Sequence, residues 1–180
     1  MRRFLLLFLV LLSACALIEK KETKVEWPSR AEYLEGMGVL DMNWKGTVYS
    51  GSASVKMEYP ALLALEVYGA FGQTLMYLKK GPDGFIFAGD GKIEDQHLFE
   101  ERYGLRLVQF MDDLALVGER QSLPGGFAIQ RIDYRVIYDS DSRGRSRICW
   151  RGREGHICLA FDEISFTQGE PAGEGGSGGH

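Results

Sequence analysis

The sequence predicts a mainly β fold, in which an antiparallel sheet is strongly curved or forms a partial barrel and a small helical insert covers its mouth. Three observations support this prediction. Apolar residues alternate with period two through most of residues 33–167, turn signals rich in Gly, Pro and Asp recur between the alternating runs, and a stretch with helical spacing interrupts the alternation once. About ten short strands exceed what a flat open sheet carries comfortably, so we expect strong curvature.

The chain begins with a pattern typical of a secretory signal. Two arginines follow Met1, and residues 4–12 form an unbroken apolar run. A helix of nine residues rises only ~14 Å, at about 1.5 Å per residue, and cannot span a hydrocarbon core of about 30 Å. We therefore expect residues 1–14 to be removed as a signal peptide.

The segment Leu12-Ser13-Ala14-Cys15 resembles the bacterial lipobox, in which the cysteine thiol is diacylated and the chain is cut before it. The alternative is an ordinary secretory signal that ends near a cysteine. The resemblance implies that Cys15 is lipidated, and two or three acyl chains make membrane attachment stable. Ala16 stands where an aspartate would signal inner-membrane retention, which favours the periplasmic face of the outer membrane.

Two segments flank the predicted domain of residues 33–167. Residues 15–32 are charged, and we interpret them as the lipidated cysteine and a tether that leads into a short helix around Ser29–Leu34. The Gly-rich residues 168–180 are expected to be disordered. Without Arg2 and Arg3 the formal net charge moves from -4 to -6, so we expect no nucleic-acid partner and a monomer.

The first half of the domain contains six predicted strands. Two lie within Met37–Tyr59, with Leu40, Met42 and Trp44 on one side of the first. Leu62–Tyr68 and Gln73–Lys79 form a hairpin around Gly69-Ala70-Phe71-Gly72, and the turn signals Gly81-Pro82-Asp83-Gly84 and Gly89-Asp90-Gly91 delimit two short strands, Phe85–Ala88 and Lys92–Glu94.

Two short helices and a second group of strands follow. Apolar residues spaced three or four apart predict helices at Gln96–Tyr103 and Leu107–Val117, separated at Gly104 and stopped at Gly118. Alternation then predicts four strands at Phe127–Tyr138, Ser146–Arg151, His156–Phe161 and Glu163–Thr167. A half-closed barrel with an apolar lining can hold a hydrophobic ligand, but small barrels are more often filled by their own side chains, and the pattern alone favours a filled core.

Residues 35–118 resemble the LolB family of outer-membrane lipoprotein receptors. The likeness rests on three short motifs: Tyr59-Pro60 before a strand of alternating Leu, the segment Tyr68-Gly69-Ala70-Phe71-Gly72-Gln73-Thr74-Leu75, and Tyr103-Gly104-Leu105-Arg106-Leu107 followed by Leu114 and Gly118. The sequence departs from the family in Phe71, where the tip is typically Leu, in Ala70, where Pro often stands, and in its last third. The resemblance implies the LolA/LolB fold, an unclosed half-barrel lidded by helices.

The resemblance also implies a function, in which the protein binds the acyl chains of lipoproteins and assists their insertion into the outer membrane. A LolA-like periplasmic carrier would be a partner, and no cofactor would be needed. The alternative is an envelope scaffold with a filled barrel that acts through protein contacts. We expect the acyl cavity to be lined by apolar side chains of the sheet and the second helix, namely Leu40, Met42, Trp44, Leu65, Val67, Leu75, Tyr77, Phe110 and Leu114.

Phe71 is the predicted membrane-contact residue, flanked by Ala70 and Gly72. The connection between its two strands is too short to fold the ring back onto a sheet face, so the ring should project into solvent unless a bilayer or partner covers it. The alternative is a ring packed across the barrel mouth.

Cys149 and Cys158 are a candidate disulfide pair. A hairpin turn centred between Arg153 and Glu154 places the two cysteines opposite each other, within bonding range in an exported protein. The alternative is two reduced, buried cysteines. The absence of a C-x-x-C motif argues against redox catalysis.

No motif in the sequence supports an enzyme or a metal site. Asp139-Ser140-Asp141-Ser142-Arg143-Gly144 superficially resembles a calcium loop, but Arg143 and Trp150 stand where ligands are required, so we expect a polar hairpin turn. The three histidines are scattered. Adjacent residues of a helix point apart, so Asp112 and Asp113 are not a carboxylate pair, and we expect them on a solvated face. We predict no catalytic residues.

Overall fold

The computed structural model describes residues 26–89 and 91–167, and their main feature is one open sheet of eleven antiparallel strands. The predicted fold class is confirmed, because the sheet is not closed into a barrel and carries two short helices. The strands are β1 (Tyr33–Trp44), β2 (Thr47–Glu58), β3 (Leu62–Tyr68), β4 (Thr74–Gly81), β5 (Gly84–Gly89), β6 (Lys92–Glu94), β7 (Arg120–Leu123), β8 (Gly126–Gln130), β9 (Tyr134–Ser140), β10 (Ser146–Gly152) and β11 (Gly155–Thr167).

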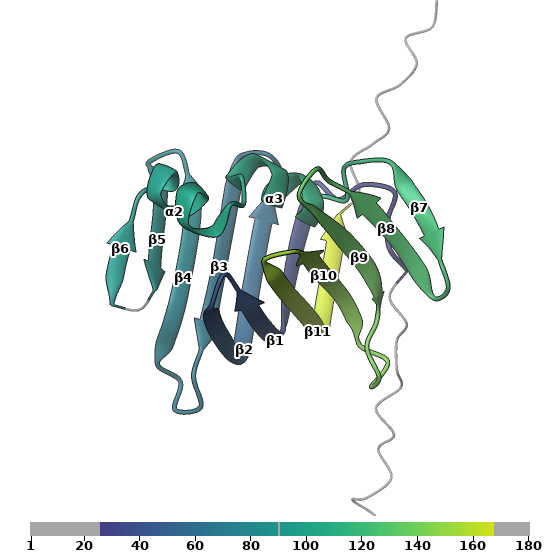
Figure 1. Ribbon diagram of the computed structural model, residues 1–180. Coiled ribbons are helices and arrows are strands. Elements are labelled where there is room, and N and C mark those ends of the chain that lie inside the picture. The colour runs from purple at the N-terminus through teal and green to yellow at the C-terminus, as the bar shows by residue number, and fades with distance from the viewer. Residues whose placement is uncertain (1–25, 90, 168–180) are drawn as a thin grey trace, which may run out of the picture.

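The sheet consists of two meanders joined through the first and last strands. Its order is β6-β5-β4-β3-β2-β1-β11-β10-β9-β8-β7, so every neighbouring pair is consecutive in sequence except β1 and β11. Those two strands pair from Tyr33 and Thr167 at one end to Trp44 and Gly155 at the other. The helices connect the two outer strands of the sheet, β6 and β7, and Figure 1 shows them lying together across the sheet.

Glycines allow β1 and β2 to bend and to approach their neighbours closely. A Cβ atom at Gly38 would lie 2.0 Å from the carbonyl oxygen of Ala160, and one at Gly51 would lie 2.2 Å from that of Tyr68. At the same level the register of β1 with β11 shifts between Met37 and Gly38, which leaves Asp162 without a partner across the ladder. Such an irregularity increases local twist and bends the sheet.

The two helices, α2 (Gln96–Tyr103) and α3 (Leu107–Leu114), have boundaries that local chemistry explains. The Asp95 side chain accepts a hydrogen bond from the Leu98 amide at the start of α2, and Gly104 ends this helix in a left-handed conformation. The Glu100 carboxylate of α2 accepts a hydrogen bond of 3.0 Å from the Leu107 amide, which caps α3. The helices are therefore coupled to each other as well as to the sheet.

Several predicted element boundaries are wrong. The helix expected around Ser29–Leu34 is absent: β1 begins at Tyr33, and the Glu32 amide bonds the Thr167 carbonyl. The single strand expected at Phe127–Tyr138 is the hairpin β8–β9, because alternation continues on both sides of its tight turn. The two strands expected at His156–Phe161 and Glu163–Thr167 are one strand, β11, interrupted only by the unpaired Asp162.

One strand was missed altogether. β7 spans Arg120–Leu123 at the edge of the sheet, and its four residues carry no alternation of apolar and polar side chains. An edge strand with no buried face lacks the period-two signal on which strand prediction depends.

The close approach of β1 to β11 predicts that Gly38→Val destabilises the fold by about 3 kcal/mol. The added side chain would collide with backbone atoms of Ala160 and Phe161, which cannot move aside as a flexible side chain can. Urea denaturation followed by tryptophan fluorescence measures the effect. Gly81→Val is the control, because a Cβ atom there meets only a Leu62 methyl group at 3.4 Å. Equal stability of the two variants would contradict this account of the bend.

Candidate functional site

The concave face of the sheet and the two helices enclose an apolar interior, which is the predicted ligand site. Four of the nine predicted lining residues border the cavity that remains there: Leu40, Met42, Leu65 and Phe110. The other residues that border it are apolar side chains that the prediction did not name: Met76, Leu78, Phe87, Phe99, Tyr103, Leu105 and Ile157.

The cavity is very small. Its volume is about 30 Å³, which is the share of one water molecule in liquid water and far below the roughly 300–1,000 Å³ of ligand pockets. Aromatic rings fill the remaining space: Phe87, Phe99 and Tyr103 pack with ring centroids 5.1–5.4 Å apart, and Phe110 lies 4.9 Å from Trp150. In this conformation the cavity does not have room for an acyl chain.

The remaining predicted lining residues lie elsewhere. Trp44, Val67 and Leu114 are buried in the core but do not border the cavity. Leu75 is partly buried against the core but does not border the cavity, and it is the extra residue where the β3–β4 register shifts. Tyr77 was assigned to the wrong face of β4, because the residues that continue the inward face are Met76 and Leu78. A slip of one residue exchanges the two faces of a strand, so alternation counted from Leu75 misplaces Tyr77.

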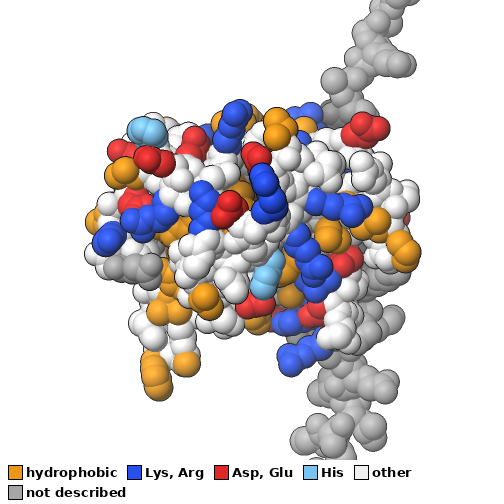
Figure 2. Space-filling view, in the orientation of Figure 1, with side chains coloured by type: hydrophobic (Ala, Val, Ile, Leu, Met, Phe, Trp, Pro, Cys, Tyr) orange, Lys and Arg blue, Asp and Glu red, His pale blue; other side chains and the backbone are white. Residues whose placement is uncertain are grey.

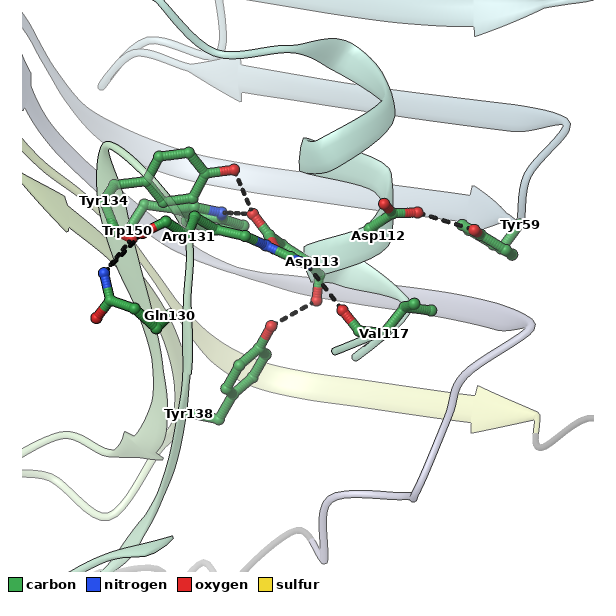
Figure 3. A network of polar contacts seen from close by, with 9 residues as sticks. All are labelled: Tyr59, Asp112, Asp113, Val117, Gln130, Arg131, Tyr134, Tyr138 and Trp150. Atoms are coloured by element: carbon green, nitrogen blue, oxygen red, sulfur yellow. Dashed lines mark hydrogen bonds and ion pairs between the residues drawn. The ribbon is translucent and has the colours of Figure 1, made fainter. Parts of the chain in front are cut away.

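A buried carboxylate fastens α3 to the sheet, as Figure 3 shows. Asp113 is fully buried, and its Oδ2 accepts hydrogen bonds of 2.9 Å from Tyr134 Oη and from Trp150 Nε1. Its Oδ1 accepts from Arg131 at 2.8 and 2.6 Å, and its main-chain carbonyl accepts from Tyr138 Oη at 2.8 Å. We call these five residues, Asp113, Arg131, Tyr134, Tyr138 and Trp150, the α3 anchor.

The neighbouring carboxylate points the other way, to the other half of the sheet. Tyr59 Oη donates a hydrogen bond of 2.8 Å to Asp112 Oδ1, and Tyr59 directly follows β2 in the first meander (Figure 3). The expectation that the two carboxylates diverge is therefore confirmed, whereas the expectation of a solvated face is wrong for Asp113. Sequence spacing gave no signal for the anchor, because its members come from α3, the β8–β9 connection, β9 and β10.

Burial determines the electrostatics of the anchor. Burial raises the pKa of Asp113, and the nearby Arg131 guanidinium and the hydrogen-bond donors offset only part of this effect. Burial alone would lower the pKa of Arg131, but the Asp113 carboxylate reverses the direction and raises it. The Asp113 carboxylate and the Arg131 guanidinium thus stabilise each other's charged form in a site that water does not reach freely.

The β3–β4 loop presents Phe71 to solvent. The Phe71 side chain is 94% exposed, and the loop projects from the end of the sheet opposite the helices in Figure 1. Hydrophobic side chains (orange) cap this projection in Figure 2. The Gln73 side chain accepts a hydrogen bond from the Phe71 amide, and the Gly69 amide bonds the Gln73 carbonyl at 2.9 Å. The loop therefore orders its own backbone while leaving the ring uncovered, and it does not pack across the barrel mouth.

Cys149 and Cys158 form a disulfide on the outer face of the sheet. They pair directly across β10 and β11, in the register that the sequence predicts. Asp141, in the loop that superficially resembles a calcium site, instead accepts hydrogen bonds from the amides of Arg143 and Arg145 and from the Arg145 side chain. No group of three or more metal-ligating side chains occurs among the described residues.

Several predictions lie outside the described residues: the signal peptide at 1–14, lipidation of Cys15, most of the tether, and the tail at 168–180. Neither helix of the described part is long and apolar enough to cross a membrane.

Comparison with known proteins adds no assignment. No protein-family model matches the sequence, and no curated protein matches it significantly.

The α3 anchor predicts a strong effect of Arg131→Met. Removing the cation leaves the buried Asp113 carboxylate without its charge partner, which should lower the free energy of unfolding by about 3 kcal/mol at neutral pH. The folded-state pKa of Asp113 is raised, so its protonation stabilises the folded chain relative to the unfolded chain as pH falls. The loss should therefore shrink in acid.

Urea denaturation at neutral and at mildly acidic pH measures both effects. Arg106→Met is the matched control, because Arg106 is exposed and has no recorded ion pair; it should change stability by less than about 0.5 kcal/mol. A loss for Arg131→Met that grows as the pH falls would show that the carboxylate is not the group left unpaired.

Proposed function

We propose that this chain is a lipid-anchored, LolB-like lipoprotein of the outer membrane, which binds lipoprotein acyl chains and assists their insertion into that membrane. The observation that carries the proposal is the self-ordered β3–β4 loop, which keeps the Phe71 ring 94% exposed at the end of the molecule. Full burial of a phenylalanine side chain contributes about 1.5–3 kcal/mol. A bilayer surface is an environment in which the exposed ring gains that energy.

In this proposal the described conformation is the closed and empty one. An acyl chain would occupy the space that the apolar side chains of α3 now fill, among them Phe110, Met111 and Leu114. Each buried methylene contributes about 0.8 kcal/mol, so ten methylenes would contribute about 8 kcal/mol, which exceeds the roughly 3–5 kcal/mol that breaking a buried ion pair costs. Displacement of α3 also exposes Phe110, Met111 and Leu114, so an acyl chain must cover the same apolar surface of the sheet that these side chains cover.

A second candidate function is supported by the cavity volume. The cavity between the described part of the sheet and its helices has only about 30 Å³ free, which favours an envelope scaffold that acts through protein contacts. This candidate needs no movement of the helices. The two functions differ in whether the interior ever accepts a ligand, and an acyl-binding measurement therefore separates them.

Arg131→Met should increase acyl binding if α3 and the ligand compete for the same face of the sheet. A variant that loosens the α3 anchor raises the population of the open form, and the apparent affinity rises with that population. Titration of the full chain with a fluorescent fatty acid measures affinity, and native mass spectrometry of chain purified from envelopes detects bound acyl mass. Arg106→Met should bind as the unsubstituted protein does. Absence of binding in all three proteins would support the scaffold.

Phe71→Glu should leave the fold intact and abolish transfer of lipoproteins to liposomes, because a charged tip does not enter the bilayer interface. The control is Ile132→Glu, since Ile132 is 91% exposed in the β8–β9 connection and is not part of the proposed tip. Circular dichroism checks the fold, and lipoprotein recovered with floated liposomes measures transfer. Normal transfer by a folded Phe71→Glu protein would contradict the assigned role of the loop.

A further inference from the structure

We propose that the outer face of strands β9, β10 and β11 binds a phosphate group through Arg135, Arg151 and His156. This face is opposite the apolar interior, because alternate residues of each strand point to opposite sides of the sheet. In β1, for example, Asp41 borders an outer groove whereas Leu40 and Met42 border the interior cavity. The proposed site is thus independent of acyl binding.

The outer groove is large enough to admit such a group. It has a volume of about 640 Å³, and Arg151 and His156 line it together with Arg145 and Arg147. Val39, Cys158 and Ala160 also line it. Arg135 does not line the groove itself but lies beside Arg151 on the neighbouring strand. Figure 2 shows Lys and Arg side chains (blue) gathered over this part of the molecule, although the whole chain carries a net charge of -4.

Strand register places the three proposed ligands in one row across the sheet. Arg151 pairs directly with Arg135 on β9 and with His156 on β11. Directly opposed residues on antiparallel strands have Cα atoms about 4.5–5.5 Å apart, so side chains from the whole row can reach one anion. Two arginines opposed in this way repel each other unless an anion lies between them.

The described residues provide no such anion for these two arginines. Neither Arg135 nor Arg151 forms a recorded ion pair, and the buried Nε of Arg135 has no hydrogen-bond partner. The neighbouring arginines differ: Arg147 binds both carboxylate oxygens of Asp139 at 2.7 and 2.8 Å, and Arg145 pairs with Asp141 at 2.8 Å. The guanidinium groups of Arg135 and Arg151 are therefore available to bind an anion that does not belong to the protein.

The surrounding charges favour one compact anion over an acidic peptide. Asp41 lies 3.3 Å from the His156 ring, and Asp141 borders the same groove. These carboxylates would repel a peptide with several acidic side chains along the groove, but leave room for a single phosphate at the Arg135–Arg151 pair. The planar guanidinium groups match phosphate oxygens in a two-point geometry. The shared chemistry is a phosphate group, either free or in a lipid headgroup.

The test uses the full chain with Cys15→Ala and Phe71→Ser, so that neither an acyl anchor nor the loop contributes to membrane binding. Titration with inorganic phosphate, followed by NMR, should shift the amide signals of Gly152, Gly155 and His156 in a saturable way. Arg151→Gln should weaken binding at least about tenfold, because it removes a charged hydrogen-bond donor. Arg106→Gln makes the same charge change at an exposed site outside the groove and should have no effect.

Flotation with phosphatidylcholine vesicles, with and without phosphatidic acid, identifies the source of the phosphate. Binding to inorganic phosphate, to phosphatidic acid or to both supports the site, provided that Arg151→Gln weakens that binding. The ligand that binds then identifies the source of the phosphate. Equal binding by the Arg151→Gln and Arg106→Gln proteins would overturn the proposal. So would an absence of saturable binding in both arms, or tighter binding of a hexaglutamate peptide than of phosphate.

Discussion

The hydrogen bonds and the ion pair to the buried Asp113 are the interactions on which the rest of the structure depends. The sheet is open, and its two meanders pair with each other through the β1–β11 ladder. Asp113 ties α3 to β9 and β10, whereas its neighbour Asp112 ties the same helix turn to Tyr59 of the other meander. A single turn of helix thus bridges both halves of the sheet on the concave face, where it fills the space that a closed barrel would enclose.

Because α3 bridges the two halves of the sheet, its position depends on whether a ligand occupies the interior. α3 and a hydrophobic ligand would bury the same sheet side chains, so they compete, and a ligand shifts the population only by its differential affinity for the open form. Polar contacts fasten the helix at its C-terminal turn, whereas its N-terminal part depends on apolar contacts and on the cap from Glu100. Displacement that begins at the N-terminal part therefore reaches the Asp113–Arg131 pair last, and full opening requires that this pair is broken.

The sequence predicted the architecture well where one strand face is uniformly apolar. The register of β10 with β11 and both helix starts follow from spacing alone, and the exposed ring of Phe71 is one of the two alternatives that the sequence left open. Prediction failed for Tyr77, where a bulge at Leu75 shifts which residues of β4 face inward, and for β7, an edge strand that buries nothing. It also failed for Asp113, because three segments distant from α3 in sequence provide the partners that make burial of its carboxylate possible.

The single-layer sheet explains how one domain can carry separate surfaces. Successive side chains of a strand point to opposite faces, so Leu40 and Met42 face the interior and Asp41 faces the outer groove. Substitutions on one face therefore leave the other face largely unchanged. The disulfide between Cys149 and Cys158 joins β10 and β11 on the outer face, one row from Arg151 and His156. It fixes the spacing of those two strands, and the outer row therefore keeps its geometry even if α3 leaves the concave face.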